Sequence, residues 1–144
     1  MKLIAIIVIG VILAGIIGFI ALAQKSKNGA PPGLVDGALA QCPSSPNCVT
    51  SEAGVPESHA IEPLPLSSWD KLPDTIQENG GRVVALRNDY IGAVFSTPLM
   101  GFADDVEFRK GETQVHVRSA SRVGHSDMGA NRKRVEALRA ALAE

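Results

Sequence analysis

Hydrophobic positions divide the chain into a continuous apolar run, a proline-rich middle and a C-terminal part with periodic patterns. Residues 3–23 are apolar apart from three glycines. At ~1.5 Å per residue, a helix of this length crosses a hydrocarbon core of ~30 Å. The run is longer than most signal-peptide cores, although Ala21-Leu22-Ala23 fits a small-x-small cleavage site. We therefore expect residues 1–23 to form a transmembrane anchor, with a signal sequence as the alternative.

The second half of the chain carries short segments that are typical of strands. Turn residues separate four of them, and we predict strands over residues 82–87, 90–97, 104–109 and 113–118. In the last two, the alternation places on one face Val106, Phe108, Val115 and Val117. The opposite face receives Asp105, Glu107, Arg109, His116 and Arg118. Such one-sided strands indicate an antiparallel sheet with one covered face.

Two segments have apolar residues at helical spacing. Trp69, Leu72 and Ile76 predict a helix that starts at Ser67 or Ser68, and Asn79-Gly80-Gly81 ends it. The second helix is predicted over 128–143, with Ser126 or Asp127 as its cap. Its apolar stripe consists of Met128, Asn131, Val135, Leu138 and Leu142. The fold class is thus α+β, a two-layer domain in which two helices cover a roughly four-stranded antiparallel sheet.

The segment between the apolar run and the domain has few large side chains. Residues 24–41 contain Asn28-Gly29 and Pro31-Pro32-Gly33, which predicts a flexible linker. Within it, Gly33–Leu39 has the composition to add a short turn against the domain. The domain itself is predicted over residues 42–144.

Two cysteines, Cys42 and Cys48, lie in a loop rich in proline and serine. In an oxidising compartment we expect a structural disulfide, worth roughly 2 kcal/mol on the chain-entropy model. The alternatives are two reduced thiols, or a redox or metal role. The spacing is not C-x-x-C, and no second pair with zinc-ligand spacing accompanies it.

Charge adds information on partners and orientation. The net charge of −1 gives no reason to expect nucleic acid as a partner. Lys25 and Lys27 follow the apolar run while Lys2 precedes it, which leans slightly towards a cytoplasmic domain. The cysteine pair favours the periplasm instead. We expect a single-pass protein of the inner membrane, held through residues 3–23, with its domain facing the periplasm.

Three blocks of sequence resemble the family called domain of unknown function 1499. They are Cys42-Pro43-Ser44-Ser45-Pro46-Asn47-Cys48-Val49, Asp104-Asp105-Val106-Glu107-Phe108, and Val117 to Gly124 with Asn131-Arg132-x-Arg134-Val135-Glu136. The resemblance covers about Cys42 to Leu142. It implies bacterial or plastid-related proteins, often behind a membrane or export segment, and it implies no established activity, substrate or cofactor.

The third block holds the candidate binding residues. Arg118, Arg122 and Arg132 could converge near the start of the last helix, where a helix N-terminus already favours anions. With them we group as ligand-binding candidates Ser119, Ser121 and Asn131. The alternative is that these arginines pair with nearby carboxylates and hold the loop to the sheet.

Other chemistry has weaker support. A hydrolase-like enzyme would use Ser119 or Ser121 with His125, but no G-x-S-x-G elbow is present. Asp104 and Asp105 should point to opposite faces of a strand, so we predict no metal site and no cofactor. Residues 98–102 form either a core plug or a lip that dips into the membrane or grips a partner.

The favoured function is a non-enzymatic envelope accessory module that binds an anionic ligand, a lipid head group or an envelope protein. A purely structural interaction protein is a further alternative.

Overall fold

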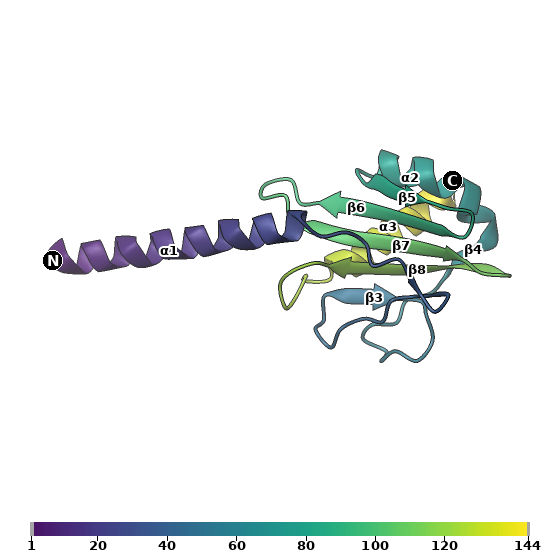
Figure 1. Ribbon diagram of the computed structural model, residues 1–144, viewed down its shortest axis with the longest axis horizontal. Helices are drawn as coiled ribbons and strands as arrows, with labels where there is room; N and C mark the ends of the chain where they lie inside the picture. The colour runs from purple at the N-terminus through teal and green to yellow at the C-terminus, as the bar shows by residue number, and fades with distance from the viewer. Residues whose placement is uncertain (1, 144) are drawn as a thin grey trace.

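The computed structural model describes residues 2–143, in which a long helix projects from a small domain (Figure 1). Helix α1 spans Lys2–Lys27 and is the one helix in the described chain that is long and apolar enough to cross a membrane. Its apolar side chains are exposed, and only Ala23 and Ser26 are buried. The helix therefore meets the domain only at its C-terminal end.

An antiparallel sheet forms the centre of the domain. Its four long strands follow one another as β5 (Arg82–Leu86), β6 (Tyr90–Ser96), β7 (Ala103–Lys110) and β8 (Gln114–Ser121). Two short strands, β3 (Cys48–Thr50) and β4 (Leu64–Pro65), both pair with β8. The strand order is β3-β8-β7-β6-β5. The predicted α+β class and the four central strands are confirmed, and two short strands are added at one edge.

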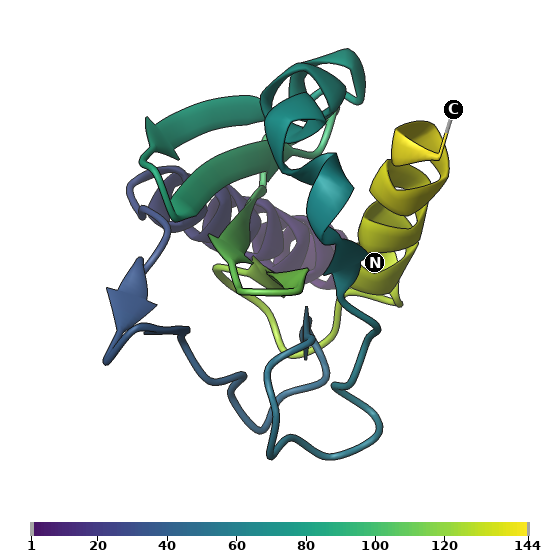
Figure 2. The same ribbon diagram turned by 90° about the vertical axis from the view of Figure 1, so that its right-hand side faces the viewer.

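Helices cover one face of the sheet, as the alternation predicted (Figure 2). A 3₁₀ helix, η1 (Leu66–Lys71), leads into α2 (Leu72–Glu78), and α3 spans Ala130–Leu142. The hydrophobic core lies between them and the sheet, and it contains Trp69, Leu72, Ile76, Val106, Phe108, Val115, Val117, Val135, Leu138 and Leu142. Gly80 ends α2 with a φ of 82°, in the left-handed conformation that glycine adopts without strain.

The start of α3 differs from the prediction. Met128 is 92% exposed and has a φ of 52°, so it lies outside the helix and its apolar stripe. The helix begins at Ala130 because the Asp127 carboxylate accepts hydrogen bonds from the backbone N–H groups of Gly129 and Asn131. The helix starts two residues later than predicted, and its N-cap residue is Gly129 instead of Ser126 or Asp127, although the Asp127 side chain does bond the first turn.

The second face of the sheet is also covered, by the segment that we predicted to be a flexible linker. Residues 24–41 continue α1 to Lys27 and then form a small hairpin of β1 (Leu34–Val35) and β2 (Ala38–Leu39) over the sheet (Figure 2). Leu39 is only 2% exposed. The flexible-linker prediction is therefore wrong for this hairpin, which lies in the Gly33–Leu39 piece that the sequence marked as a turn.

Two carboxylates, Glu107 of β7 and Glu52 of the loop after β3, hold this segment in place. The backbone N–H of Gly33 donates to Glu107 Oε1 at 2.8 Å, and that of Leu39 donates to Glu52 Oε1 at 3.1 Å. Burial alone would raise the pKa of Glu52, but hydrogen bonds from Arg109 and Leu39 outweigh it and lower the pKa below its ordinary value. Buried charges need hydrogen-bond partners, and the backbone N–H groups of Gly33 and Leu39 supply them. These bonds explain why a segment with few large side chains is ordered.

Cys42 and Cys48 form the expected disulfide, which ties the loop before β3 to the strand itself. Because Cys48 lies opposite Ala120 of β8, the disulfide is anchored beside the third sequence block.

Candidate functional site

Ion pairs occupy the polar face of the sheet. Arg118 lies opposite Glu107 in the β7–β8 register, and its Nη1 donates to Glu107 Oε2 at 2.9 Å. The Tyr90 hydroxyl donates to the other oxygen of Glu107 at 2.8 Å. Burial, together with the Glu107 charge, raises the pKa of Tyr90. Glu107 is fully buried and Arg118 is 7% exposed, so this pair is sealed beneath the N-terminal segment.

Arg122 joins α1 to the sheet. Its Nη2 and Nε donate to the Asp105 carboxylate at distances from 2.6 to 3.0 Å, and its Nη1 donates to the Ser26 carbonyl oxygen at 3.0 Å. The Ser26 hydroxyl in turn accepts from the N–H of Ala103 at 2.7 Å and donates to its carbonyl. The last turn of α1 is thus fastened to the first residue of β7.

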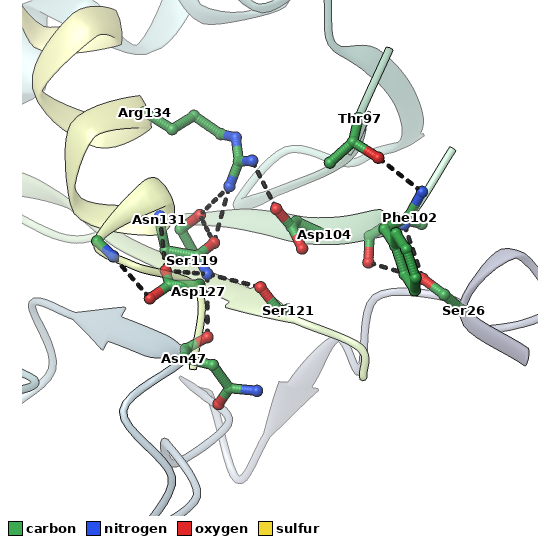
Figure 3. Close-up of polar contacts among 12 residues, drawn as sticks. Ser26, Asn47, Thr97, Phe102, Asp104, Ser119, Ser121, Asp127, Asn131 and Arg134 are labelled. Carbon is green, nitrogen blue, oxygen red and sulfur yellow. Dashed lines mark hydrogen bonds and ion pairs between the residues drawn. The ribbon is translucent and has the colours of Figure 1, made fainter. Parts of the chain in front are cut away.

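A buried amide organises the opposite face (Figure 3). We call the Asn131 network the set Asn47, Asp104, Ser119, Ser121, Asp127, Asn131 and Arg134. The Asn131 side-chain oxygen accepts from Ser119 Oγ at 2.6 Å and from Arg134 Nη1 at 2.8 Å. Its Nδ2 is within hydrogen-bond distance of the Asn47 carbonyl, Ser121 Oγ and Asp127 Oδ2. One side chain therefore links the loop before β3, strand β8 and helix α3.

Arg134 and Asp127 bring opposite charges to this network. Arg134 Nη2 pairs with Asp104 Oδ2 at 2.6 Å, while its guanidinium lies 5.1 Å from the centre of the Phe95 ring. Burial alone would raise the pKa of Asp127, but hydrogen bonds from Asn131 and Gly129 lower it below the ordinary value. Asp127 is therefore ionised at neutral pH.

The six candidate binding residues do not form one pocket. The predicted convergence of the three arginines is wrong, because Arg118 and Arg122 pair with separate carboxylates and Arg132 donates to the Ser58 carbonyl oxygen at 3.1 Å. Ser119 and Ser121 lie inside β8, which extends beyond the predicted end of that strand because it pairs with β7 and β3 there. Ser119, Arg118 and Asn131 are buried.

The geometry also bears on the two rival interpretations, serine hydrolysis and metal binding. Ser119 and Ser121 are hydrogen-bonded to Asn131, and no hydrogen bond links either serine to His125 within residues 2–143. Asp104 and Asp105 point to opposite faces, as predicted, and pair with Arg134 and Arg122. Within the described part of the chain, no three His, Cys, Asp or Glu side chains group closely enough to hold a metal ion.

A cavity of about 200 Å³, which we call the basic groove, lies beside the end of α1. Lys27, Arg82 and Arg122 line it together with backbone and small side chains from Gly29 to Pro31, β6 and β7, and no carboxylate is among its lining residues. Arg82 opens β5 opposite Val94. Among the described residues, neither Lys27 nor Arg82 has a carboxylate within ion-pair distance. Arg122 is thus the one predicted binding arginine that reaches this cavity.

A second cavity of about 290 Å³, the junction pocket, lies between α1 and the loops at the same end of the sheet. Phe19 and Leu22 of α1 and Phe102 give it an apolar side. The Phe19 and Phe102 rings meet edge to face, with centroids 5.0 Å apart. Its polar side includes Asp104, Ser121 and Asp127. The predicted core-plug role of residues 98–102 is wrong for Leu99, which is 92% exposed.

Sequence reasoning missed most of the residues that line these cavities. Lys27 entered only as an orientation signal, and nothing in the local sequence distinguishes Arg82 from any arginine at a strand start. Phe19 carried no clear signal either, because the aromatic residues that mark membrane interfaces are Trp and Tyr, whose rings have a polar group.

Comparison with known proteins gives one result. No curated protein and no solved structure matches this chain. The model of a family described as "Protein of unknown function (DUF1499)" matches residues 38–142, which is most of the chain and contains the sheet, the disulfide loop and α3. The chain therefore belongs to the DUF1499 family.

Proposed function

We propose that this protein is a non-enzymatic, membrane-anchored accessory module of the cell envelope that binds anionic lipid head groups in the basic groove. The observation that carries the proposal is the groove itself, a concave site lined by three cationic side chains and no carboxylate. Lys27 lies about one helical turn beyond the apolar run of α1. That height corresponds to the phosphate layer of a bilayer crossed by the helix.

The contacts of α1 support a retained anchor over a cleaved signal sequence. Ala23, the last residue that cleavage at the small-x-small site would remove, is only 4% exposed. Phe19, which a cut after Ala23 would remove, packs against Phe102. A segment discarded after export would have no need for such contacts.

Electrostatics favour an anionic head group. Each Lys or Arg close to an anionic membrane surface contributes about 1 kcal/mol of attraction. Among residues 2–143, Lys27 and Arg82 have no carboxylate within ion-pair distance, whereas Asp105 already neutralises Arg122. A phosphate in the groove would therefore meet a net positive site with backbone groups close by.

The test measures lipid-induced stabilisation of the full-length protein in neutral detergent. We expect phosphatidylglycerol to raise the Tm more than phosphatidylcholine, and we expect added salt to weaken the effect. In Lys27→Ala and in Arg82→Ala, affinity for phosphatidylglycerol should fall about fivefold each, since ~1 kcal/mol is lost per charge.

A matched control uses Arg87→Ala, since Arg87 is an exposed arginine at the other end of the β5–β6 hairpin. This variant should retain the wild-type lipid response. A Lys27→Ala/Arg82→Ala double variant that still responds like the wild type would refute the groove as the site, and the structural-scaffold alternative would then gain support.

We also propose that the domain faces the periplasm, with the anchor in the inner membrane. The Cys42–Cys48 disulfide supports this orientation, because such bonds persist in oxidising compartments. Lys27 lines the basic groove, so its place after the apolar run has an explanation other than a cytoplasmic domain. Alkylation of cell-derived protein under denaturing, non-reducing conditions should leave both cysteines unlabelled, and two free thiols would contradict a periplasmic domain.

A further inference from the structure

We infer that the junction pocket is a second lipid site, which binds a single-chain amphiphile whose head is an amine or a hydroxyl group. The inference rests on the membrane anchoring proposed above but not on the basic groove. The two cavities lie beside each other, since Ala103 lines both. Their lining residues nevertheless call for opposite kinds of head group.

The apolar side of the pocket is continuous with the surface that the bilayer would cover. Phe19 and Leu22 belong to the last turns of the apolar run, and both line the pocket. A cavity that uses side chains of a membrane-spanning helix opens at the depth of the lipid interface. An acyl chain could therefore run along these side chains without leaving the hydrocarbon.

The polar side of the pocket is rich in hydrogen-bond acceptors. Asp104 uses Oδ2 for Arg134, whereas its Oδ1 makes no hydrogen bond among residues 2–143 (Figure 3). Ser121 Oγ accepts from Asn131, which leaves its own proton free to donate. These groups match a head that donates hydrogen bonds, and a hydroxyl head could also accept one from Ser121.

The local charge disfavours an anion here. Arg134 balances Asp104, but Asp127 has no cationic partner within ion-pair distance among the described residues. The carboxylate of Asp127 is held ionised by the N-terminus of α3. A carboxylate or phosphate head would therefore meet a net negative wall, whereas an ammonium group would be attracted.

The volume of the junction pocket limits the class of ligand that it can hold. A cavity of about 290 Å³ is at the small end of ligand sites and accommodates a small head with the first part of one chain. A complete two-chain phospholipid is too large for it.

The experiment compares three probes with the same twelve-carbon chain: dodecylamine, dodecanol and dodecanoate. Each is titrated into the full-length protein in neutral detergent at pH 8, and Tm shifts give the apparent affinity. We expect dodecylamine and dodecanol to raise the Tm and dodecanoate to bind at least tenfold more weakly. Equal or tighter binding of dodecanoate would overturn the assignment of the head group.

A blocking variant tests the location. Leu22→Trp adds bulk on the helix side of the pocket and replaces no residue of the sheet or of the Asn131 network, so the fold should survive. Dodecylamine affinity should fall at least tenfold in Leu22→Trp and stay at the wild-type value in Leu13→Trp, a control on the same helix away from the domain. Wild-type affinity in Leu22→Trp would overturn the proposal.

The two lipid sites are separable in the same assay. The Lys27→Ala/Arg82→Ala double variant should keep its response to dodecylamine, and Leu22→Trp should keep its response to phosphatidylglycerol. If phosphatidylglycerol does not stabilise the wild type, the proposed lipid site in the basic groove is refuted and the junction pocket is not. If dodecylamine does not stabilise the wild type although phosphatidylglycerol does, the proposed lipid site in the junction pocket is refuted.

Discussion

At the scale of single residues, Asn131 is the best-connected polar side chain in the domain. It is fully buried, and its amide contacts groups from three separate segments. Two of its partners, Ser119 and Asn47, are buried as well, so water cannot replace the amide there. Asn131 belongs to one of the sequence blocks that carry the family resemblance. The network gives this residue a structural role, whether or not it also binds a ligand.

We predict that Asn131→Ala lowers the free energy of unfolding by about 2–4 kcal/mol, since Ser119, Arg134 and the Asn47 carbonyl would lose a buried partner. Chemical denaturation of the full-length protein in detergent measures the change. The exposed neighbour Lys133 offers a control, and Lys133→Ala should change stability by less than about 0.5 kcal/mol. A similar loss in both variants would contradict a central role for the amide.

Side-chain faces could be read from the sequence, but partners could not. Strand parity correctly placed Asp105, Glu107 and Arg118 on one face of the sheet. Which carboxylate meets Arg118 depends on the register of the β7–β8 hairpin, and the structure pairs it with Glu107. The turn at Gly111 sets that register, and its exact length was not determined by the pattern of hydrophobic residues.

At the scale of elements, the junction between α1 and β7 fixes the long helix to the domain. The Arg122 guanidinium bonds the carbonyl of Ser26 in the last turn of α1, where the helix dipole favours a cation. Asp105 fixes the same guanidinium from the other side. The arginine that the sequence suggested as a ligand group therefore also serves as a cap for the helix.

We predict that Arg122→Ala loosens this junction while the sheet remains folded. Amide hydrogen exchange over residues 24–33 should become at least tenfold faster, and exchange in the core strand β8 up to Val117 should change little, because the hydrophobic core is untouched. Arg132→Ala, which removes a partly exposed arginine bonded to a loop carbonyl, should leave the exchange of residues 24–33 as in the wild type. Unchanged exchange in Arg122→Ala would show that the cap is dispensable.

Long elements with strong periodicity were predictable, and short or polar ones were not. The apolar helix, the four central strands and both covering helices follow from patterns that depend on the local sequence alone. Strands β3 and β4 have only three and two residues. The first begins at Cys48, at the end of a loop rich in proline and serine, and the second ends at Pro65, a residue that disfavours strands. Likewise, the hairpin over residues 34–39 is held by carboxylates that are remote in sequence, so no local pattern reveals it.

At the scale of the whole molecule, two apolar loop tips flank the point where α1 leaves the domain. Leu99 lies in the β6–β7 loop and Met128 in the β8–α3 loop, and both are 92% exposed (Figure 1). Both loops project at the end of the sheet from which α1 extends. If the helix spans a bilayer, these tips face its surface, in agreement with the lip interpretation of residues 98–102.

We predict that Leu99 inserts into the lipid interface. A Leu99→Cys variant labelled with the environment-sensitive fluorophore NBD should show blue-shifted, enhanced emission in nanodiscs, and brominated lipids should quench it. Leu86→Cys provides the control, because Leu86 is an exposed leucine at the opposite end of the sheet. Equal quenching at the two positions, or none at Leu99, would contradict insertion.

If α1 spans a bilayer, its direct fastening to β7 limits how far from that bilayer the domain can reach. A domain on a long disordered tether samples a wide volume above the lipid, but here the last helical turn is already part of the folded body. The reach is therefore set by the dimensions of the domain alone. A bilayer crossed by α1 would cover the α1 end of the domain, and a soluble partner would then approach the outward-facing end.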